Sequence, residues 1–233
     1  MAMLKSKRGV RHLFTYSLWK GIFDRLLALL GVVVLSPLLI LTAIGIRLDS
    51  PGNPIFSQER VGKDGRRFVV HKFRTMHVNN DDSKYKEYLR RLVTQGVPYG
   101  VDRQRRPVYK VADDPRVTRM GALLRKTNLD ELPQLFNVLK GEMSFVGPRP
   151  DIPFSVELYE DWHRKRLSVK PGITGMWQVC ERANHSFDEM VRLDIEYVER
   201  QSPLLDSKIM LLTVDTILRR DGSYQERKEM RDG

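Results

Sequence analysis

The chain has 233 residues, enough to bury one hydrophobic core, and a single domain with an attached membrane element is expected. Its 40 Lys and Arg against 29 Asp and Glu give a net charge of +11. This surplus indicates either a solvated basic surface or an anionic partner, such as nucleic acid, a charged bilayer or a phosphorylated substrate. Cys180 is the only cysteine, which excludes an intrachain disulfide, fits a reducing cytosol and leaves no zinc-type Cys/His spacing.

The first predicted element is an apolar helix near the N-terminus. Residues 26–46 read LLALLGVVVLSPLLILTAIGI, a run of 21 residues without an ionisable group. This length is about what a helix needs to cross the hydrocarbon core of a bilayer. The run is too long for the apolar region of a cleaved signal peptide, and a fully buried soluble helix is the less favoured alternative.

Two features of this run favour a re-entrant hairpin over an ordinary kinked span. Ser36-Pro37 lies at its middle, where proline removes a helical hydrogen bond and the Ser36 hydroxyl can supply a replacement. Basic residues also flank the run on both sides, whereas basic flanks prefer the cytoplasmic face. These flanking residues are Lys5, Lys7, Arg8, Arg11, Lys20 and Arg25 before it, and Arg47, Arg60, Lys63, Arg66, Arg67, Lys72 and Arg74 after it.

The middle of the chain predicts a turn, a hairpin and a surface excursion. DSPGN at residues 49–53 closes the membrane element. Asp64-Gly65 lies between two short apolar pieces and predicts a β-hairpin. Further on, a polar stretch predicts a helix at residues 85–93 followed by a loop at 96–107.

The second half of the chain is predicted to be mainly helical. Residues 121–140 have helical periodicity, with Gly141 as a C-terminal cap. Because Pro133 is tolerated only in a first turn, the helix that ends at Gly141 is expected to begin near residues 128–130. An extended Gly/Pro loop at 146–150 precedes predicted helices at 153–167, 186–200 and, in amphipathic form, 204–218.

Asp130 and Glu131 are the first candidates for chemistry. A carboxylate with an ordinary pKa is ionised at neutral pH, so it can attack phosphorus without a general base. Two adjacent carboxylates also suit Mg²⁺, and a helix N-terminus favours bound phosphate. The same residues are common helix caps, and on this evidence alone capping is the favoured interpretation.

Basic residues near this pair are candidates for binding phosphate. Arg149 stands between two prolines, which restrict its backbone, and a guanidinium binds phosphate with two parallel hydrogen bonds. Arg125 lies five residues before Asp130, and Lys72 and Arg74 are weaker candidates. For each of them the alternative is a solvated surface side chain.

Taken together, these motifs resemble the bacterial sugar transferase family, also called polyprenyl-phosphate hexose-1-phosphate transferases or monotopic phosphoglycosyl transferases. The resemblance covers nearly the whole chain, and its most specific block is DELPQLFNVLKGEMSFVGPRP. The other matching stretches are WKGIFDRLLALLGVVVLSPLLIL, GNPIFSQERVGKDGRRFVVHKFRTM, DDPRVTRMGALLRKTNL and PGITGMWQV. Asn128 and the segment WQVCERAN depart from the usual pattern, and the second departure bears on sugar preference.

The resemblance implies a single mostly helical α+β domain over residues 1–233, monotopic in the membrane. Residues 1–48 would hold the re-entrant helix broken at Ser36-Pro37, and 49–233 the cytosolic catalytic part, with a small β-hairpin and interfacial amphipathic helices. The protein would sit in the bacterial inner membrane with its catalytic part on the cytoplasmic face. Larger family members carry further N-terminal transmembrane helices, so this sequence would be a minimal form or an excised catalytic portion.

By matching position, the resemblance makes Asp130 the nucleophile and Glu131 its magnesium-binding partner. Arg125 and Arg149 would contact phosphates or the nucleotide. The implied reaction transfers a sugar 1-phosphate from a UDP-sugar to polyprenyl (undecaprenyl) phosphate, through a phosphosugar–aspartate intermediate, and releases UMP. It would begin the assembly of a membrane-bound glycan.

Two other functions stay open at this point. One is a phosphohydrolase that uses the same carboxylate pair with water as the acceptor. The other is a non-catalytic basic protein that binds acidic lipid or nucleic acid, although no helix-turn-helix, zinc-finger or RNA-binding signature is present and a nucleic-acid partner is not predicted. The sequence leaves the transferred sugar and the oligomeric state undetermined.

Overall fold

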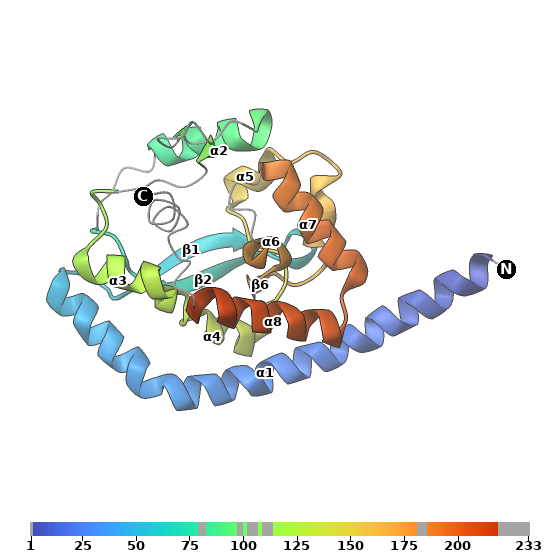
Figure 1. Cartoon of the computed structure of the whole chain (residues 1–233), viewed down its shortest axis with the longest axis horizontal. Coiled ribbons are helices and arrows are strands. Elements are labelled where there is room, and N and C mark those ends of the chain that lie inside the picture. The colour runs from blue at the N-terminus through green and yellow to red at the C-terminus, as the bar shows by residue number, and fades with distance from the viewer. Residues whose placement is uncertain are drawn as a thin grey trace, which may run out of the picture.

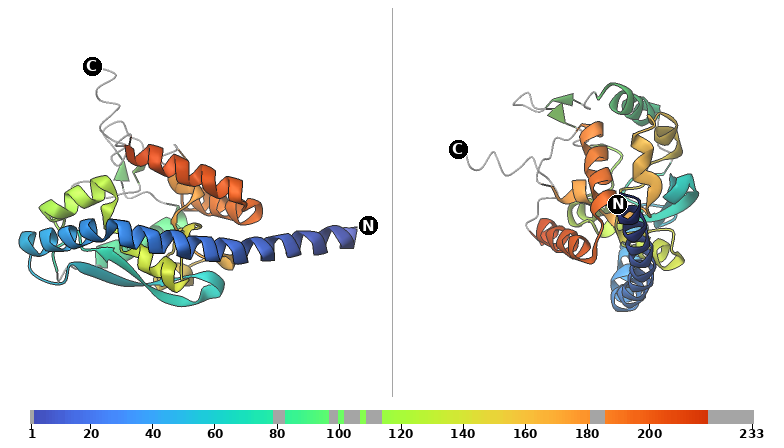
Figure 2. Two further views of the ribbon diagram at one scale, coloured as in Figure 1. Left: turned by 90° about the horizontal axis from the view of Figure 1, so that it is seen from below. Right: turned by 90° about the vertical axis from the view of Figure 1, so that its right-hand side faces the viewer.

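The computed structural model describes residues 2–78, 83–96, 100–101, 107–108, 114–180 and 186–218. Its first element is a 48-residue helix, α1 (Ala2–Asp49), which lies along the underside of the remaining elements in Figure 1. Short strands and a set of shorter helices form the body above it, and the view from below in Figure 2 shows α1 running across that body. The predicted class, mostly helical with a small hairpin and one long apolar helix, is confirmed.

Helix α1 is longer than predicted and continues through its proline. The ribbon bends once along its length in Figure 1, yet the helix has no break at Pro37. The part from Tyr16 to Asp49 is long and apolar enough to cross a membrane. It is also held against the body, because it packs on α3, α4 and β5.

The predicted hairpin is present. Strands β1 (Ile55–Val61) and β2 (Arg67–Phe73) pair antiparallel in a register that places Gln58 opposite Val70. The connection between them contains a short 3₁₀ turn, η1 (Lys63–Gly65), with Asp64 at φ 56° and Gly65 at φ 77°. These left-handed conformations explain the Asp-Gly pair at the turn.

The surface excursion after β2 contains more structure than predicted. Helix α2 (Ser83–Gln95) includes the predicted 85–93 segment and extends it at both ends. Within the stretch predicted to be a loop, Gly100–Val101 (β3) pairs antiparallel with Pro107–Val108 (β4).

The predicted helical region 121–140 is divided into three elements. Helix α3 (Arg119–Thr127) begins at Thr118, whose side chain accepts a hydrogen bond from the Gly121 amide, and ends at a left-handed Asn128. A 3₁₀ turn, η2 (Leu129–Glu131), then leads to α4 (Gln134–Lys140), which ends at a left-handed Gly141 as predicted. The expected helix start near 128–130 is therefore wrong: Pro133 occupies the cap position, and the carboxylate pair lies on the preceding 3₁₀ turn.

The C-terminal half builds a parallel strand pair and two long helices. Strand β5 (Ser144–Val146) pairs parallel with β6 (Gly172–Thr174). The single helix predicted at 153–167 is wrong, because the structure has α5 (Pro153–Glu157) and a separate 3₁₀ segment, η3 (His163–Ser168). A short α6 (Met176–Val179) precedes α7 (Phe187–Arg200) and α8 (Pro203–Leu218), both close to the predicted bounds. A capping box formed by Ser186 and Glu189 starts α7.

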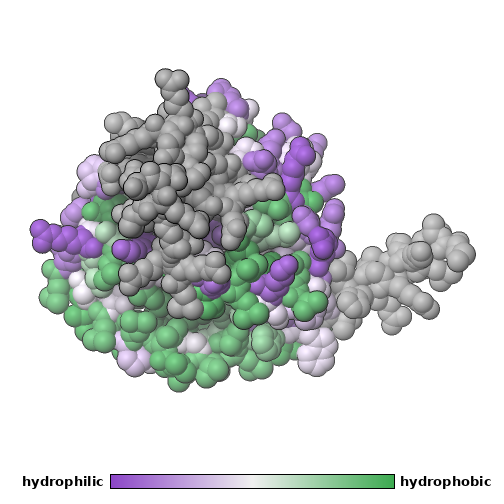
Figure 3. All heavy atoms as spheres, in the orientation of Figure 1, coloured by the Kyte–Doolittle hydropathy of each residue, from purple (hydrophilic) through white to green (hydrophobic). Residues whose placement is uncertain are grey.

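Apolar side chains remain exposed over one side of the molecule. Figure 3 shows them along the lower edge, where Figure 1 places α1. A patch of this size marks a membrane or protein contact surface rather than an ordinary solvated surface. Its members on α1 include Trp19, Phe23, Leu26, Leu30, Val34, Leu41 and Leu48, and apolar side chains of α8 such as Leu204 and Leu211 are exposed as well.

Candidate active site

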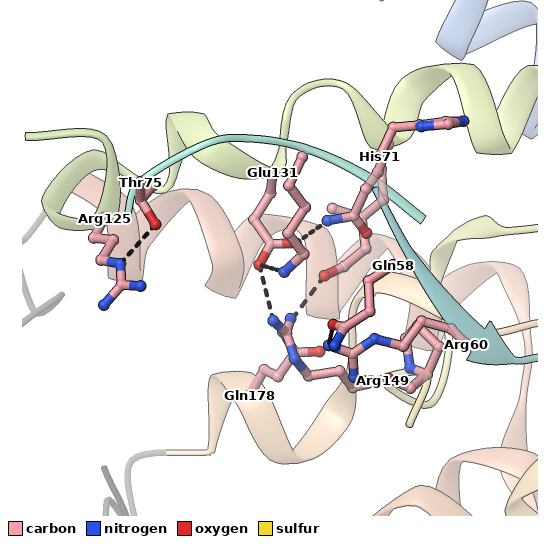
Figure 4. A network of polar contacts seen from close by, with 12 residues as sticks. Gln58, Arg60, His71, Thr75, Arg125, Glu131, Arg149 and Gln178 are labelled. Atoms are coloured by element: carbon pink, nitrogen blue, oxygen red, sulfur yellow. Dashed lines mark hydrogen bonds and ion pairs between the residues drawn. The ribbon is translucent and has the colours of Figure 1, made fainter. Parts of the chain in front are cut away.

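The Glu131 carboxylate lies at the centre of a polar cluster drawn from three separate parts of the chain (Figure 4). Its Oε1 atom accepts hydrogen bonds from Lys72 Nζ at 2.7 Å and from Arg149 Nη2 at 2.9 Å. Its Oε2 atom accepts from the Gln134 side-chain amide. The structure therefore brings together three of the predicted site residues, Lys72, Glu131 and Arg149.

Lys72 reaches Glu131 because α4 is fastened to the edge of β2. The side chain of Asn137, which is fully buried, donates to the Val69 carbonyl at 2.6 Å and accepts from the His71 amide at 3.2 Å. It thus satisfies two backbone groups of β2 that would otherwise need a third strand. This contact sets α4, and the turn just before it, beside Lys72.

Arg149 is presented by a loop whose backbone is held from several sides. Four consecutive carbonyls each accept a hydrogen bond: Pro148 from the Gly172 amide, Arg149 from Arg166, Pro150 from Arg60, and Asp151 from the Val61 amide. The donors belong to β6, η3 and β1. The two prolines limit the backbone as expected, and these contacts remove the remaining freedom.

Glycines allow this loop to pack so closely. A Cβ atom added at Gly172 would lie 2.1 Å from the Gly147 amide nitrogen, and one at Gly147 would lie 2.4 Å from the Lys170 carbonyl oxygen. Only glycine fits at such backbone contacts. The glycines of the SFVGPRP and PGITG motifs are thus explained by contact with each other.

The pKa values of Glu131 and Lys72 are both lowered in this cluster, but for different reasons. Burial by itself would raise the pKa of Glu131, but the charges of Arg149 and Lys72, with their hydrogen bonds, lower it to about 2. Burial and repulsion by Arg149 lower the pKa of Lys72 to about 8, although Glu131 opposes this shift. At neutral pH the cluster therefore holds an ionised Glu131 between two cations.

Asp130 differs from its neighbour in its contacts. Within the described part of the chain, no hydrogen bond or ion pair occupies its carboxylate, which is half-buried. Burial and the adjacent Glu131 charge raise its pKa, whereas the charges of Lys72, Arg149 and Arg125 act to lower it. The pair thus consists of one carboxylate fixed by three donors and one left available.

Arg125 lies at the margin of the site. Helix α3 crosses the end of β2 so closely that a Cβ at Gly121 would meet the Thr75 carbonyl oxygen at 2.1 Å. The exposed Arg125 side chain donates to Thr75 Oγ1 at 3.0 Å, and its charge still acts on Asp130. It is near the pair without contacting Glu131.

Arg74 is not brought to the cluster. Its buried guanidinium donates to the carbonyl oxygens of Ser50, at 2.8 Å, and of Pro51. It therefore closes the turn after α1. Side chains two residues apart on a strand lie on the same side, so Arg74 would share the side of Lys72 if β2 continued. Arg74 lies just beyond the end of β2, and this rule no longer applies to it.

The donor set fits a magnesium ion. Mg²⁺ usually takes one or two protein carboxylates and completes its shell with water and substrate phosphate. Asp130 has both oxygens free of hydrogen bonds from described residues, and Glu131 Oε2 accepts only one. Asp130 and Glu131 are the residues that would hold the ion; among the residues that the structure describes, no three His, Cys, Asp or Glu side chains gather at one place.

Sequence reasoning missed several residues that complete this site. Gln134 binds Glu131, while Arg60 donates to Gln58 Oε1 at 2.6 Å beside the Arg149 loop. Figure 4 also places Gln178 next to Arg149. Helical spacing from Glu131 to Gln134 was an available signal, whereas Gln58 and Arg60 come close only through the hairpin.

Comparison with known proteins assigns the family. The sequence model described as "Bacterial sugar transferase" matches residues 15–220, which is most of the chain. The chain belongs to the bacterial sugar transferase family. The matched region includes α1 from residue 15 to its end, and every member of the Glu131 cluster.

Individual members of the family show how much of each protein is shared. The chain is 40% identical over 206 residues to the galactosyl transferase CpsE of Streptococcus agalactiae, covering 88% of this chain and 43% of that protein. The undecaprenyl-phosphate galactose phosphotransferase of Salmonella typhimurium is 40% identical over 205 residues, 88% of this chain and 41% of the relative. The exopolysaccharide production protein ExoY of Sinorhizobium fredii is 38% identical, with 88% of both chains covered. The chain thus spans about two fifths of the first two relatives and most of the third.

Proposed function

We propose that this protein transfers a sugar 1-phosphate from a UDP-sugar to polyprenyl phosphate and releases UMP. Family membership supports the reaction class, and the Salmonella relative is named for an undecaprenyl-phosphate acceptor. A relative in Xanthomonas campestris, 35% identical, is named for UDP-glucose as the donor. By this proposal the enzyme starts a lipid-linked glycan; the Sinorhizobium relative is named for exopolysaccharide production.

The proposed reaction has two displacements at the same phosphorus. First, an Asp130 carboxylate oxygen forms a bond to the sugar-bearing phosphorus, and the bond from that phosphorus to the bridging oxygen breaks, so that UMP leaves with the oxygen. Then an oxygen of polyprenyl phosphate attacks the phosphorus of the aspartyl intermediate, and the bond to Asp130 breaks. The carboxylate is regenerated and no proton is consumed.

The difference between Asp130 and Glu131 carries this assignment. Hydrogen bonds from Lys72, Arg149 and Gln134 lower the nucleophilicity of Glu131 by holding its lone pairs. Asp130 has no such donors among the described residues, so it is the oxygen nucleophile of the pair. Lys72 and Arg149 would then stabilise charge on the transferring phosphoryl group, the main contribution to phosphoryl transfer.

Mg²⁺ belongs to this proposal, with Asp130 and Glu131 as the residues that would hold it. When bound, the ion would neutralise phosphate charge during the reaction. The protein's own residues do the rest: Arg149 and Lys72 orient the diphosphate, and Arg125 extends the positive surface beyond Asp130. Chelation of divalent ions is expected to stop UMP release, and added Mg²⁺ to restore it.

We also propose that α1 enters the cytoplasmic leaflet of the bacterial inner membrane, bends at Ser36-Pro37 and returns to the same face. The exposed apolar side chains of α1 support contact with lipid, while its packing along α3, α4 and β5 keeps the body against that membrane face. A straight span would carry part of α1 away from these partners. The arrangement would place the lipid acceptor beside the water-soluble donor.

Covalent labelling tests the nucleophile. Purified protein incubated with UDP-sugar labelled in the sugar, without lipid, should acquire label that polyprenyl phosphate then removes. Asp130→Asn should acquire none. Asp64→Asn is a matched control, because Asp64 is exposed at the hairpin turn and Asn also tolerates its left-handed conformation. Equal labelling of Asp130→Asn and the control would reject the assignment.

Product analysis separates the transferase from its rivals. UMP release that requires polyprenyl phosphate for turnover supports transfer. Continuous release without lipid identifies a hydrolase, and no release at all identifies a binding protein.

A further inference from the structure

The guanidinium of Arg166 contacts the loop that carries Arg149. Its Nη2 atom donates to the Arg149 carbonyl oxygen at 3.1 Å and forms an ion pair with Asp194 Oδ2 at 2.5 Å. Its Nη1 atom donates to Asp151 Oδ2 at 3.1 Å and to the Tyr159 hydroxyl at 2.8 Å. The two terminal nitrogens thus make three hydrogen bonds and one ion pair with four oxygen atoms, two of which belong to the loop.

This arrangement is buried, and in it one guanidinium pairs with two carboxylates, those of Asp151 and Asp194. Arg166 is 4% exposed and Asp194, on α7, is 0% exposed. A buried ion pair contributes little net stability, because the loss of hydration offsets the attraction. Its contribution here is orientation: a planar fork with fixed geometry determines where the Arg149 carbonyl and the Asp151 carboxylate can lie.

We infer that Arg166 is a positioning residue for the proposed transfer: it sets the orientation of the Arg149 guanidinium toward Glu131 and the donor diphosphate. The inference rests on the proposed function and adds a role for a residue that touches no substrate. Its path is short, since the atom that Arg166 binds is the carbonyl of Arg149 itself.

Arg166→Lys is the informative substitution. Lysine keeps the positive charge that pairs with Asp194, but its single ammonium lacks the planar fork that reaches all four oxygen atoms. A displacement of about 1 Å in a positioned group is expected to reduce kcat/KM roughly tenfold to a hundredfold. Arg200→Lys is the matched control, because Arg200 is exposed at the end of α7 and pairs with Glu196 of its own helix.

A double-mutant cycle with Arg149→Ala distinguishes positioning from general support. If Arg166 acts through the Arg149 guanidinium, Arg166→Lys should cost less than twofold once that guanidinium is absent. The same loss in both backgrounds would overturn the inference, as would full activity of Arg166→Lys alone. Thermal unfolding of each protein shows whether the fold is intact.

A second pair of variants covers the case in which Arg166→Lys does not fold. Arg166→Met combined with Asp194→Leu removes both buried charges together, so neither is left unpaired. In the same cycle its cost should fall below twofold once Arg149 is replaced by alanine, and an equal loss in both backgrounds would overturn the inference.

Binding of UDP provides a readout that does not depend on turnover. The Kd for UDP, measured for each protein of the cycle, should rise on Arg166→Lys only when Arg149 is present. If the wild-type protein binds UDP but never releases UMP from a UDP-sugar, the proposed function fails while the positioning role is still decided by these Kd values.

Discussion

The Ser36 hydroxyl donates a 2.8 Å hydrogen bond to the carbonyl oxygen of Val33, the acceptor that Pro37 leaves without its helical donor. Proline has no backbone N–H, so the carbonyl four residues earlier would be unsatisfied in an apolar surrounding. The serine therefore makes the bend tolerable within a continuous helix.

Replacement of Pro37 by alanine should straighten α1 and change its topology. In a Cys180→Ser background, single cysteines at Ser17 and Lys63, both exposed, report the two ends of the membrane segment. In intact spheroplasts a membrane-impermeant maleimide should label neither end of the otherwise unchanged protein. With Pro37→Ala the Ser17 position should become labelled from outside. If neither position is labelled in that variant, Pro37 is not required for the return of α1 to the same membrane face.

The pH dependence of turnover should report Lys72. Because burial and Arg149 lower its pKa to about 8, the lysine loses its charge as the pH rises through that value, and kcat/KM should fall there. Glu131 acts in the opposite direction, so its removal in Glu131→Gln should move this alkaline fall to lower pH. Lys72→Arg should abolish the fall, since a guanidinium stays charged up to far higher pH. An alkaline limb unchanged in Lys72→Arg assigns the titration to another group.

Substitution of Asn137 should destabilise the protein without altering any charged site residue. In Asn137→Leu the Val69 carbonyl and the His71 amide lose their partners, which should cost about 2–4 kcal/mol of unfolding free energy. Denaturant unfolding in detergent measures this. Lys140→Ala, an exposed position on the same helix, should change stability by less than about 0.5 kcal/mol.

Gly172→Ala should impair activity through the Arg149 loop. The added Cβ would meet the Gly147 amide nitrogen at 2.1 Å, and backbone cannot move aside as a flexible side chain can. The loop must shift, so kcat/KM is expected to drop roughly a hundredfold. Gly21→Ala provides the comparison, because there the new Cβ would be 3.8 Å from its nearest neighbour, Lys170 Nζ. Similar effects from both substitutions would argue against a specific role for the loop contact.

The sequence predicted the elements whose signals are local. Helix α7 carries its own capping box, Gly141 ends α4, and Asp64-Gly65 turns the hairpin. The prediction was wrong at the helix over residues 121–140. Asn128 adopts a left-handed conformation there and turns the chain between α3 and η2, and the sequence does not signal this because asparagine also occurs inside helices. The segment 153–167 is also divided, between α5 and η3, but there the helix ends at a right-handed Leu158.

The candidate site was predictable in its chemistry and only partly in its geometry. The motifs of the sequence identify Asp130, Glu131 and Arg149. Lys72 lies beside Glu131 because the Asn137 side chain attaches α4 to β2. Arg74, two residues from Lys72, satisfied the same sequence criteria but caps a turn instead. Arg166 gave no signal, because a fully buried arginine is recognised only when its acceptors are known.

The four hydrogen-bonded carbonyls from Pro148 to Asp151 determine where chimeras of two family members can be joined without loss of activity. Each carbonyl takes its donor from a segment distant in sequence, so a chimera joined anywhere between residues 61 and 166 gives this loop at least one foreign donor. Hybrid enzymes should therefore keep activity best when hairpin, loop and the 166–172 segment come from one parent. Substitutions meant to change the donor sugar are better placed outside the hairpin, the loop and the 166–172 segment.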